Sequence, residues 1–338
     1  MKKRRSVLVI INPIAGVRPK EEVPRLVREA LPESDFEVHI RMTQYAGHAT
    51  TLARCAAIRG VDTVVAIGGD GTINETARGL VGTDTALALV PMGSGNGLAR
   101  HIQIPLEASR ALAVVREGHA EYVDYGMVGD HIFFCTAGIG FDAQVSQRFS
   151  TMKHRGGFTY VQSVIDLLTS FQPSPYVVQT PDHRYVEKAF LIAIGNASQW
   201  GNNAYITPRA SMQDGMMDIT LVRPFNIINA PQMALQLFAR NIDENEHILS
   251  LRASHFSIIM PHKDIVHIDG EPFMMGPRLD IRTVRSGLKV LTPSVPTAGL
   301  LEPLQYAFEE IHYSILNNFK EIARGVKRVA EKWEEEGR

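Results

Sequence analysis

The stretch Thr63-Val64-Val65-Ala66-Ile67 runs directly into Gly68-Gly69-Asp70-Gly71-Thr72, and this junction decides the fold. Its apolar half, rich in β-branched residues, predicts a buried strand, and its glycines predict a tight turn that leads into a helix. Thr72 and Glu75 have the spacing of a capping box, so we expect the helix to begin at Thr72. Backbone N–H groups at such a helix start attract phosphate, and glycines let the backbone approach a ligand closely.

Asp70, in the middle of this turn, indicates what binds there. A carboxylate beside phosphates is repulsive unless it binds a metal or takes a proton, and Mg²⁺ commonly bridges carboxylates and phosphates. A dinucleotide fingerprint does not fit, because Asn74 stands where its third glycine belongs, and no Gly-x-x-x-x-Gly-Lys-Ser/Thr P-loop occurs. An ordinary strand-to-helix turn is the alternative.

The same alternation of short apolar runs and helical patterns fills the first 120 residues and predicts a parallel sheet covered on both faces. Two further loops follow strands directly, Asn12-Pro13-Ile14-Ala15-Gly16 and Pro91-Met92-Gly93-Ser94-Gly95-Asn96-Gly97. Ligands of such sheets bind outside the carboxyl ends of the strands, so we expect the loops to surround a nucleotide. The predicted strands are residues 7–11, 36–41, 63–67 and 85–90, and the predicted helices are 21–31, 48–59, 73–80, 98–102 and 106–117.

The pattern changes near residue 121 to strand-like runs joined by turns, which predicts a second, mainly antiparallel domain built as a β-sandwich. The first runs, 122–128 and 131–139, form a hairpin around Gly129-Asp130. We expect domains at 1–122 and 123–296 and a helical tail at 297–338. The other predicted strands are 176–180, 186–196, 216–223, 255–260, 264–269, 279–284 and 289–291, with helical patches at 158–170 and 227–240.

Composition narrows the class of protein. The 338 residues carry a formal net charge of -1, so no global basic field points to nucleic acid. Two isolated cysteines, Cys55 and Cys135, fit a reducing cytoplasm better than a disulfide framework. The basic start followed by residues 6–11 imitates a signal peptide, but Asn12-Pro13 breaks the apolar run too early. We therefore expect a cytoplasmic protein without a membrane-spanning segment.

Three motifs occur in order: Ile11-Asn12-Pro13-x-x-Gly16, then Gly68-Gly69-Asp70-Gly71-Thr72-x-x-Glu75, then Pro91-x-Gly93-Ser94-x-Asn96-x-x-Ala99-Arg100. Over roughly residues 1–290 the chain resembles the diacylglycerol kinase catalytic domain shared with sphingosine kinases, ceramide kinases and bacterial lipid kinases. The resemblance implies an NAD kinase/diacylglycerol kinase-like α/β domain, a β-sandwich domain for the lipid, and ATP with Mg²⁺ as cofactors.

The resemblance also implies roles for individual residues. Glu271, within Ile268-Asp269-Gly270-Glu271, matches the general base, and Asp70 and Asp269 complete the catalytic set; without the resemblance this segment is a hairpin turn. Ser211, Asp214 and Met216 match a structural Mg²⁺ loop. The matched nucleotide contacts are Asn12, Pro13, Ile14, Ala15, Gly16, Thr43, Gly68, Gly69, Asp70, Gly71, Thr72, Glu75, Gly93, Ser94 and Asn96.

The acceptor is less defined than the phosphoryl transfer. Many bacterial diacylglycerol kinases carry Thr and Asp where this chain has Ser94 and Gly97, and the Ser94 form looks more like sphingosine kinases. The resemblance therefore implies that the acceptor is diacylglycerol or a related lipid such as a sphingoid long-chain base, and we expect the enzyme to meet it transiently at a membrane surface. An NAD kinase-like small-molecule kinase and a non-catalytic lipid-binding module are the alternatives, and a homodimer is left open.

Overall fold

A computed structural model describes residues 4–14, 22–151, 167–168 and 170–294. Ala15 and Gly16, most of the predicted helical patch at 158–170 and the predicted tail at 297–338 lie outside the described residues. No helix among the described ranges is long and apolar enough to cross a membrane.

The first part of the chain forms the predicted parallel sheet, in the order β2 (Phe36–Met42), β1 (Arg5–Ile11), β3 (Thr63–Gly68) and β4 (Ala86–Pro91). Every residue of β3 and β4 is buried, as their continuous apolar sequences require. Helix α2 (His48–Ile58) packs on α3 (Asp70–Leu80), and α1 (Val23–Ala30) packs on α5 (Ala108–Glu117). The short α4 (Gly97–His101) follows β4.

The predicted capping box is wrong. Helix α3 begins at Asp70, with Gly69 as its N-cap in an extended conformation. The Glu75 carboxylate instead accepts hydrogen bonds from the backbone N–H groups of Gly47 (2.8 Å) and Ala49 (3.3 Å). Glu75 therefore caps the start of α2 and joins it to α3.

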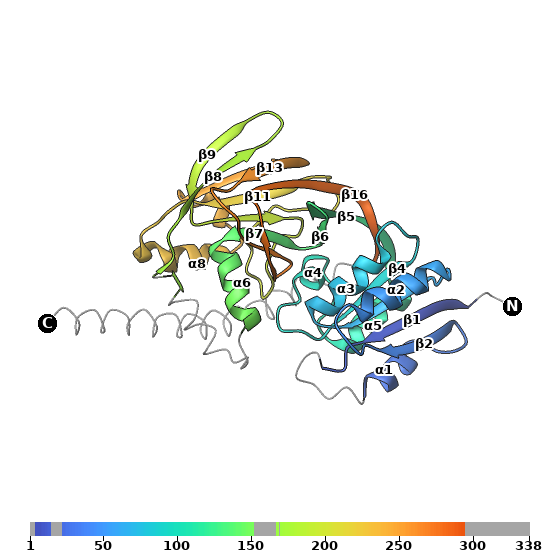
Figure 1. The fold of residues 1–338 in the computed structure, drawn as a ribbon. Helices are drawn as coiled ribbons and strands as arrows, with labels where there is room; N and C mark the ends of the chain where they lie inside the picture. Colours follow the sequence, from blue (N-terminus) through green and yellow to red (C-terminus); the bar gives the residue numbers. More distant parts are fainter. Residues whose placement is uncertain (1–3, 15–21, 152–166, 169, 295–338) are drawn as a thin grey trace.

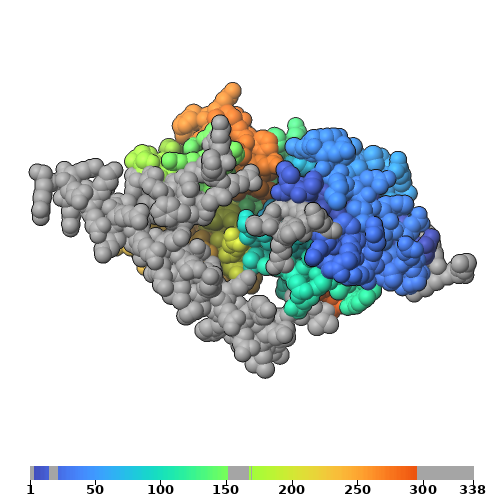
Figure 2. All heavy atoms as spheres, turned by 90° about the horizontal axis from the view of Figure 1, so that it is seen from below, coloured from blue at the N-terminus to red at the C-terminus, as the bar shows by residue number. Residues whose placement is uncertain are grey.

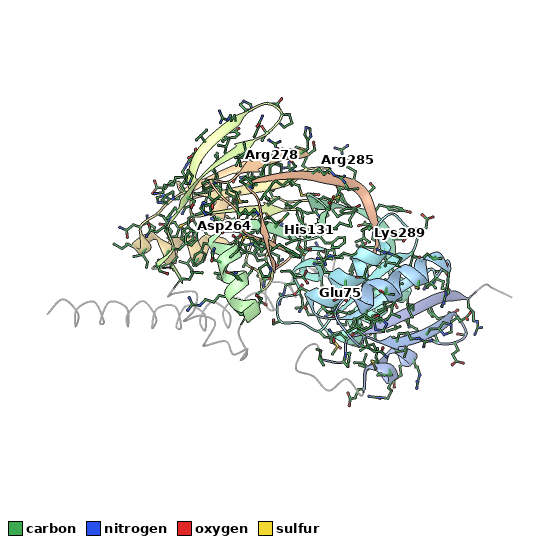
Figure 3. All side chains as sticks on the ribbon, in the orientation of Figure 1. Glu75, His131, Asp264, Arg278, Arg285 and Lys289 are labelled. Atoms are coloured by element: carbon green, nitrogen blue, oxygen red, sulfur yellow. The ribbon has the colours of Figure 1, made fainter. Side chains whose placement is uncertain are left out.

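One long strand, β16 (Arg278–Thr292), connects the two parts of the chain (Figure 1). Near its C-terminal end, β16 pairs parallel with β4, at Val290 and Leu87. It also pairs antiparallel with β5 (His119–Val128) and with β13 (His255–Ile259). Lys289 lies beside the first part and Arg278 over the second (Figure 3). Beyond β13 the sheet continues through β8 (Ser174–Gln179) and β9 (Arg184–Ala189), and β6 (His131–Phe133) pairs with β5.

The second sheet is wholly antiparallel, in the order β12 (Ile248–Ala253), β11 (Met217–Val222), β10 (Leu191–Gly195), β7 (Thr136–Gly140), β14 (Asp264–Ile268) and β15 (Glu271–Met275). One buried cluster joins Ile194 and Ile219 of this sheet to Val178 and Ile258 of the first, so the sheets pack face to face. The predicted fold class, α/β followed by an antiparallel sandwich, is confirmed. Figure 2 shows the first part, in blue, directly beside the second part, in green to orange.

Several elements differ from the expected ones. The predicted strands 131–139 and 186–196 are each two strands that lie in different sheets, β6 with β7 and β9 with β10. Strands β12 and β15 and helix α6 (Phe141–Thr151) lie where no element was predicted. The predicted strands 279–284 and 289–291 are one strand, β16, with an irregularity between Val284 and Leu288. The predicted helical patch at 227–240 is α8 (Ala230–Phe238) preceded by a 3-10 turn (Ile227–Asn229), and a second 3-10 turn (Ile242–Glu244) follows.

Candidate active site

The carboxyl ends of β1, β2, β3 and β4 meet at one edge and bring the predicted nucleotide loops together. Asn12, directly after β1, donates a hydrogen bond from Nδ2 to Thr72 Oγ1 on α3 at 2.9 Å. Thr43, directly after β2, donates its backbone N–H to the Ile11 carbonyl at 2.9 Å. Residues 60 positions apart are thus neighbours at the phosphate-attracting start of α3.

The two glycine loops lie against each other. A Cβ atom on Gly93 would stand 2.7 Å from the Gly69 Cα atom, so the approach requires glycine. Asn96 holds its loop closed: its Oδ1 accepts from Gly93 N–H at 3.0 Å and its Nδ2 donates to the Gly93 carbonyl at 2.9 Å. Asn96 adopts φ 52, a conformation that asparagine tolerates better than most residues.

The Asp70 carboxylate ties these loops to each other. Its Oδ2 accepts from Asn96 N–H and its Oδ1 from Gly97 N–H, both at 2.8 Å. Asp70 therefore has a structural role that the sequence did not reveal. Each oxygen keeps a further lone pair, so the carboxylate still fits Mg²⁺, which takes carboxylate and phosphate oxygens. The described residues hold no cluster of three metal-ligating side chains.

Among the remaining predicted nucleotide contacts, some side chains are buried or already engaged and others are exposed to solvent. Thr72 is buried, and Glu75 is directed to the start of α2. Ile14 is 89% exposed, far more than an ordinary isoleucine side chain, at the rim of the same edge. The exposed members of the predicted set are Pro13, Ile14, Gly71 and Ser94.

Asp269 is buried in the junction between the two parts of the chain. Its carboxylate accepts four hydrogen bonds, from Asn74 Nδ2 on α3 (2.7 Å) and from the backbone N–H groups of Phe134 (2.7 Å), Cys135 (2.8 Å) and Thr136 (3.0 Å). Burial raises the pKa of the Asp269 carboxyl, and these four donors oppose the rise. Asp269 therefore fixes α3 to the second sheet.

Glu271 begins β15, directly after the two-residue turn Asp269-Gly270, whose φ angles are 49 and 83. The segment is thus a β-hairpin turn, as its sequence alone indicates. The Glu271 carboxylate lies 3.5 Å from Arg78 Nη2, and its side chain is 52% exposed. Arg78 and Asn74 stand one helical turn apart on α3, so Glu271 and Asp269 both contact this helix.

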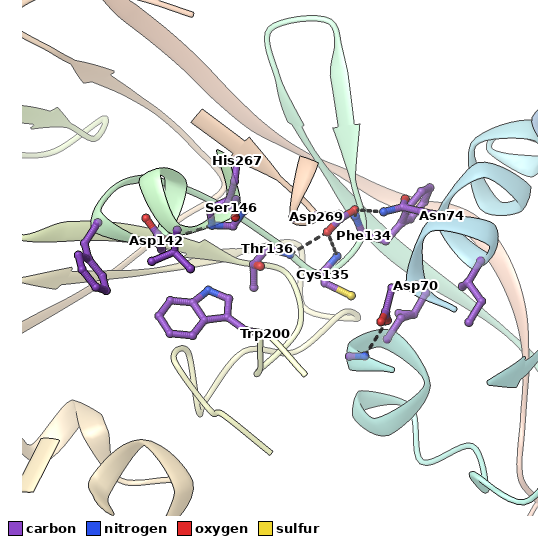
Figure 4. A pocket seen from close by; sticks show the side chains of 16 residues that line it. Asp70, Asn74, Phe134, Cys135, Thr136, Asp142, Ser146, Trp200, His267 and Asp269 are labelled. Atoms are coloured by element: carbon purple, nitrogen blue, oxygen red, sulfur yellow. Dashed lines mark hydrogen bonds and ion pairs between the residues drawn. The ribbon is translucent and has the colours of Figure 1, made fainter. Parts of the chain in front are cut away.

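A cavity of about 400 Å³ opens between α3, α4 and the second sheet (Figure 4). Asp70, Asn74 and Asp269 line it, whereas Glu271 does not. Burial, with the Asp269 and Asp70 carboxylates, raises the pKa of the Cys135 thiol in its wall, so this thiol stays protonated and is a poor nucleophile. The lining residues that the sequence did not indicate are Ile73, Leu98, Phe134, Cys135, Thr136, Phe141, Asp142, Val145, Ser146, Trp200 and His267.

The predicted structural Mg²⁺ loop lies at the start of β11. Asp214 Oδ1 accepts from Met216 N–H at 2.9 Å, and Asp214 Oδ2 pairs with the Arg252 guanidinium. Arg252 Nε also lies 3.3 Å from Asp218 Oδ2. Burial raises the pKa of Asp218 to about 6, against the attraction of Arg252. The oxygen donors suit Mg²⁺, but the ion would compete with Arg252 for Asp214.

Asp214→Ala should lower the melting temperature, because it removes both the predicted Mg²⁺ ligand and the partner of Arg252. Each kcal/mol lost shifts the midpoint by roughly 2–4 °C in a protein of this size. The two contributions separate with a chelator: wild type should melt lower in chelator, and the variant should not respond. Asp182→Ala, at an exposed turn, is the matched control. A wild-type midpoint that ignores chelator removes the Mg²⁺ assignment and leaves the Arg252 pair.

The comparisons with known proteins agree with this geometry. Residues 6–128 match the family model "Diacylglycerol kinase catalytic domain", and residues 135–292 match "YegS C-terminal NAD kinase beta sandwich-like domain". Over 257 residues the chain is 31% identical to "Probable lipid kinase YegS-like" of Chromohalobacter salexigens, which covers 73% of this chain and 82% of that protein. It is 28% identical to "Probable lipid kinase YegS" of Salmonella dublin, over 85% of this chain and 96% of that one.

Two solved structures share the fold. A diacylglycerol kinase from Bacillus anthracis str. Sterne has a TM-score of 0.67 at 21% identity and covers 87% of this chain and 99% of its own. An NAD kinase from Archaeoglobus fulgidus, solved in complex with ATP, has a TM-score of 0.50 at 12% identity, over 91% and 98%. The predicted family is confirmed: this chain belongs to the diacylglycerol kinase catalytic-domain family, in its YegS-like branch, with the YegS-type second domain.

Proposed function

We propose that this protein is a kinase that transfers the γ-phosphoryl group of ATP to the hydroxyl of a lipid. One observation carries the proposal: the two glycine loops that Asp70 ties together lie beside a largely apolar cavity. The loops suit a triphosphate, and the cavity suits an acyl chain with a small polar head. Phosphoryl transfer needs little more than positioning and charge neutralisation, and this arrangement supplies positioning.

In this proposal the loop segments 68–72 and 93–96 surround the phosphates, and Asn12 and Thr43 border the nucleotide. Asp70 would hold Mg²⁺, which neutralises charge on the phosphates when it is bound. Glu271 takes the proton of the lipid hydroxyl as general base. Asp269, with all its lone pairs directed to N–H donors, acts as a positioning residue for the hairpin that carries Glu271.

The apolar lining of the cavity supports a lipid acceptor over the acceptor of an NAD kinase. Phe134, Phe141, Val145 and Trp200 suit a hydrocarbon chain better than the polar ribose of a dinucleotide, which an NAD kinase would phosphorylate. A non-catalytic lipid-binding module would have no use for a closed phosphate loop. The fold alone does not separate these activities, because an NAD kinase shares it.

An acceptor screen tests the proposal. Purified protein with labelled ATP and Mg²⁺ should phosphorylate a diacylglycerol, a monoacylglycerol or a sphingoid base in mixed micelles, and should leave NAD unlabelled. Labelled NAD with no labelled lipid would establish the alternative kinase. Lipid binding without ATP turnover would establish the non-catalytic module.

We propose that the enzyme is cytoplasmic and visits the membrane transiently. The basic residues near the start of the chain, Lys2 to Arg5, would make this contact. Arg5 is already engaged, because its Nη2 donates to the Arg116 carbonyl at 3.1 Å and its guanidinium lies over the Phe36 ring. In the same screen, anionic vesicles replace micelles. Turnover on vesicles should then fall as salt rises, since basic segments bind anionic lipid through screened charges. If turnover on vesicles does not depend on salt, the basic segment does not bind the membrane.

A further inference from the structure

Three buried polar atoms without hydrogen-bond partners among the described residues belong to side chains that line the cavity. They are Asn74 Oδ1, Trp200 Nε1 and His267 Nδ1. Only three other such side-chain atoms occur in the described part of the chain, at Asn196, Asn241 and Thr283, and none of those residues lines this cavity. Because an unpaired buried polar group is costly, this concentration points to a ligand that pairs with them.

Asn74 Oδ1 is an acceptor near the phosphate end. The amide Nδ2 of Asn74 donates to Asp269, which leaves Oδ1 as the unpartnered atom. Asn74 lies one helical turn from Asp70, whose carboxylate joins the phosphate loops. A hydroxyl about to be phosphorylated would lie at this end, so in the bound substrate its O–H would donate to Asn74 Oδ1 until Glu271 takes the proton.

His267 Nδ1 is a second acceptor, held by a buried pair. His267 Nε2 lies 3.0 Å from Asp142 Oδ2, and these side chains are 4% and 8% exposed. A carboxylate oxygen accepts hydrogen bonds, so Nε2 is the ring nitrogen that donates to Asp142, and in that tautomer Nδ1 is left to accept. A Cβ atom on Gly138 would overlap with both Asp142 and His267, so the pair fits because this residue is glycine.

Trp200 Nε1 is a donor and lies apart from Asp70. In Figure 4 Trp200, Asp142 and His267 stand at one end of the cavity, with Thr136 and Cys135 between them and Asp70. An indole N–H is a donor only, so it needs an acceptor at this point of the ligand, and the carbonyl oxygen of an ester supplies one. A ligand with two hydrogen-bond donors and one acceptor would therefore pair with all three atoms. One donor would be the reacting hydroxyl near Asn74, and the second donor would lie farther from it, near His267.

We propose that the cavity selects lipids whose head carries a second hydrogen-bond donor beside a carbonyl, as in a monoacylglycerol. This inference rests on the proposed lipid kinase function and names its acceptor class. The reacting hydroxyl pairs with Asn74, the second hydroxyl with His267 and the ester carbonyl with Trp200. A diacylglycerol has one hydroxyl and otherwise only acceptors, so it leaves His267 unpaired.

The test compares 1-monopalmitoylglycerol with 3-hydroxypropyl palmitate, which lacks only the second hydroxyl. Wild type should prefer the monoacylglycerol in kcat/KM by about 10-fold, the range of one hydrogen bond between neutral groups. In His267→Gln the side-chain amide can still donate to Asp142, but the acceptor at the Nδ1 position is gone. The preference should fall to about one, with the loss confined to the monoacylglycerol.

The controls separate this inference from the proposed function. His183→Gln, at an exposed position, should keep the wild-type preference. Trp200→Phe should also keep the preference for the monoacylglycerol over 3-hydroxypropyl palmitate. It should lose the preference for 1-monopalmitoylglycerol over its 1-O-alkyl ether analogue, because that preference depends on the indole N–H. This second measurement still tests the inference if His267→Gln fails to fold. Equal turnover of the two palmitates by wild type overturns the inference, leaves water as the partner of these atoms and leaves the lipid kinase intact. No turnover of any lipid overturns both.

Discussion

Replacing Glu271 by glutamine is expected to lower the rate of lipid phosphorylation by about 10²–10⁴-fold, the usual contribution of a positioned general base. Glutamine keeps the shape of the side chain and can still contact Arg78 through its amide oxygen, but it cannot take a proton. Glu271 is about half exposed and lies outside the phosphate loops, so ATP affinity measured by calorimetry should not change. The expected result is therefore a loss in turnover alone.

The control for this prediction is Glu246→Gln, which removes a carboxylate that is 86% exposed and should leave turnover at the wild-type rate. Full activity of Glu271→Gln would make the base assignment wrong. The base would then be sought among the carboxylates that do line the cavity, Asp70, Asp142 and Asp269. A matching fall in ATP affinity would instead indicate that the pair with Arg78 supports α3.

The sequence predicted the strands and loops at the carboxyl edge of the first sheet well because their signals are local. Each of the strands β1, β3 and β4 is a short apolar run, and the loop that follows carries its own glycines and polar residues. The capping box failed for a related reason. The Thr72 and Glu75 pattern is local, but Glu75 contacts Gly47 on another element, and only the packing of α2 on α3 decides that.

The cavity could not be predicted in this way. His267 and Asp142 lie 125 positions apart, and neither stands in a pattern that indicates a ligand. The Asp269-Gly270 dipeptide indicates a turn, and nothing in its sequence says that the carboxylate is buried among four N–H donors. The prediction also divided β16 into two strands, 279–284 and 289–291. In the structure Ser286 has φ 49 and donates its N–H to the buried Asp124, so the strand continues past it.

Asp70→Asn is the second change expected to have a large effect, on nucleotide binding and turnover together. Asparagine has nearly the same shape but no charge, so it should weaken binding of Mg²⁺ and ATP. It also has only one side-chain acceptor oxygen where Asp70 has two, so one of the N–H groups of Asn96 and Gly97 would face an NH₂ donor. We expect turnover to fall by about 10²–10³-fold, as when a group that stabilises charge in the transition state is removed.

A second variant separates the loss of charge from the loosening of the loop. Asn96→Gly keeps the Asp70 charge and both N–H groups and tolerates the φ of 52, but removes the side chain that closes the second loop. If charge dominates, Asp70→Asn should raise the Mg²⁺ concentration needed for half-maximal turnover, and Asn96→Gly should not. If loop geometry dominates, both variants should lose ATP affinity by similar factors at saturating Mg²⁺. An Asp70→Asn protein with full activity would remove the nucleotide site from this edge, and the proposed kinase function with it.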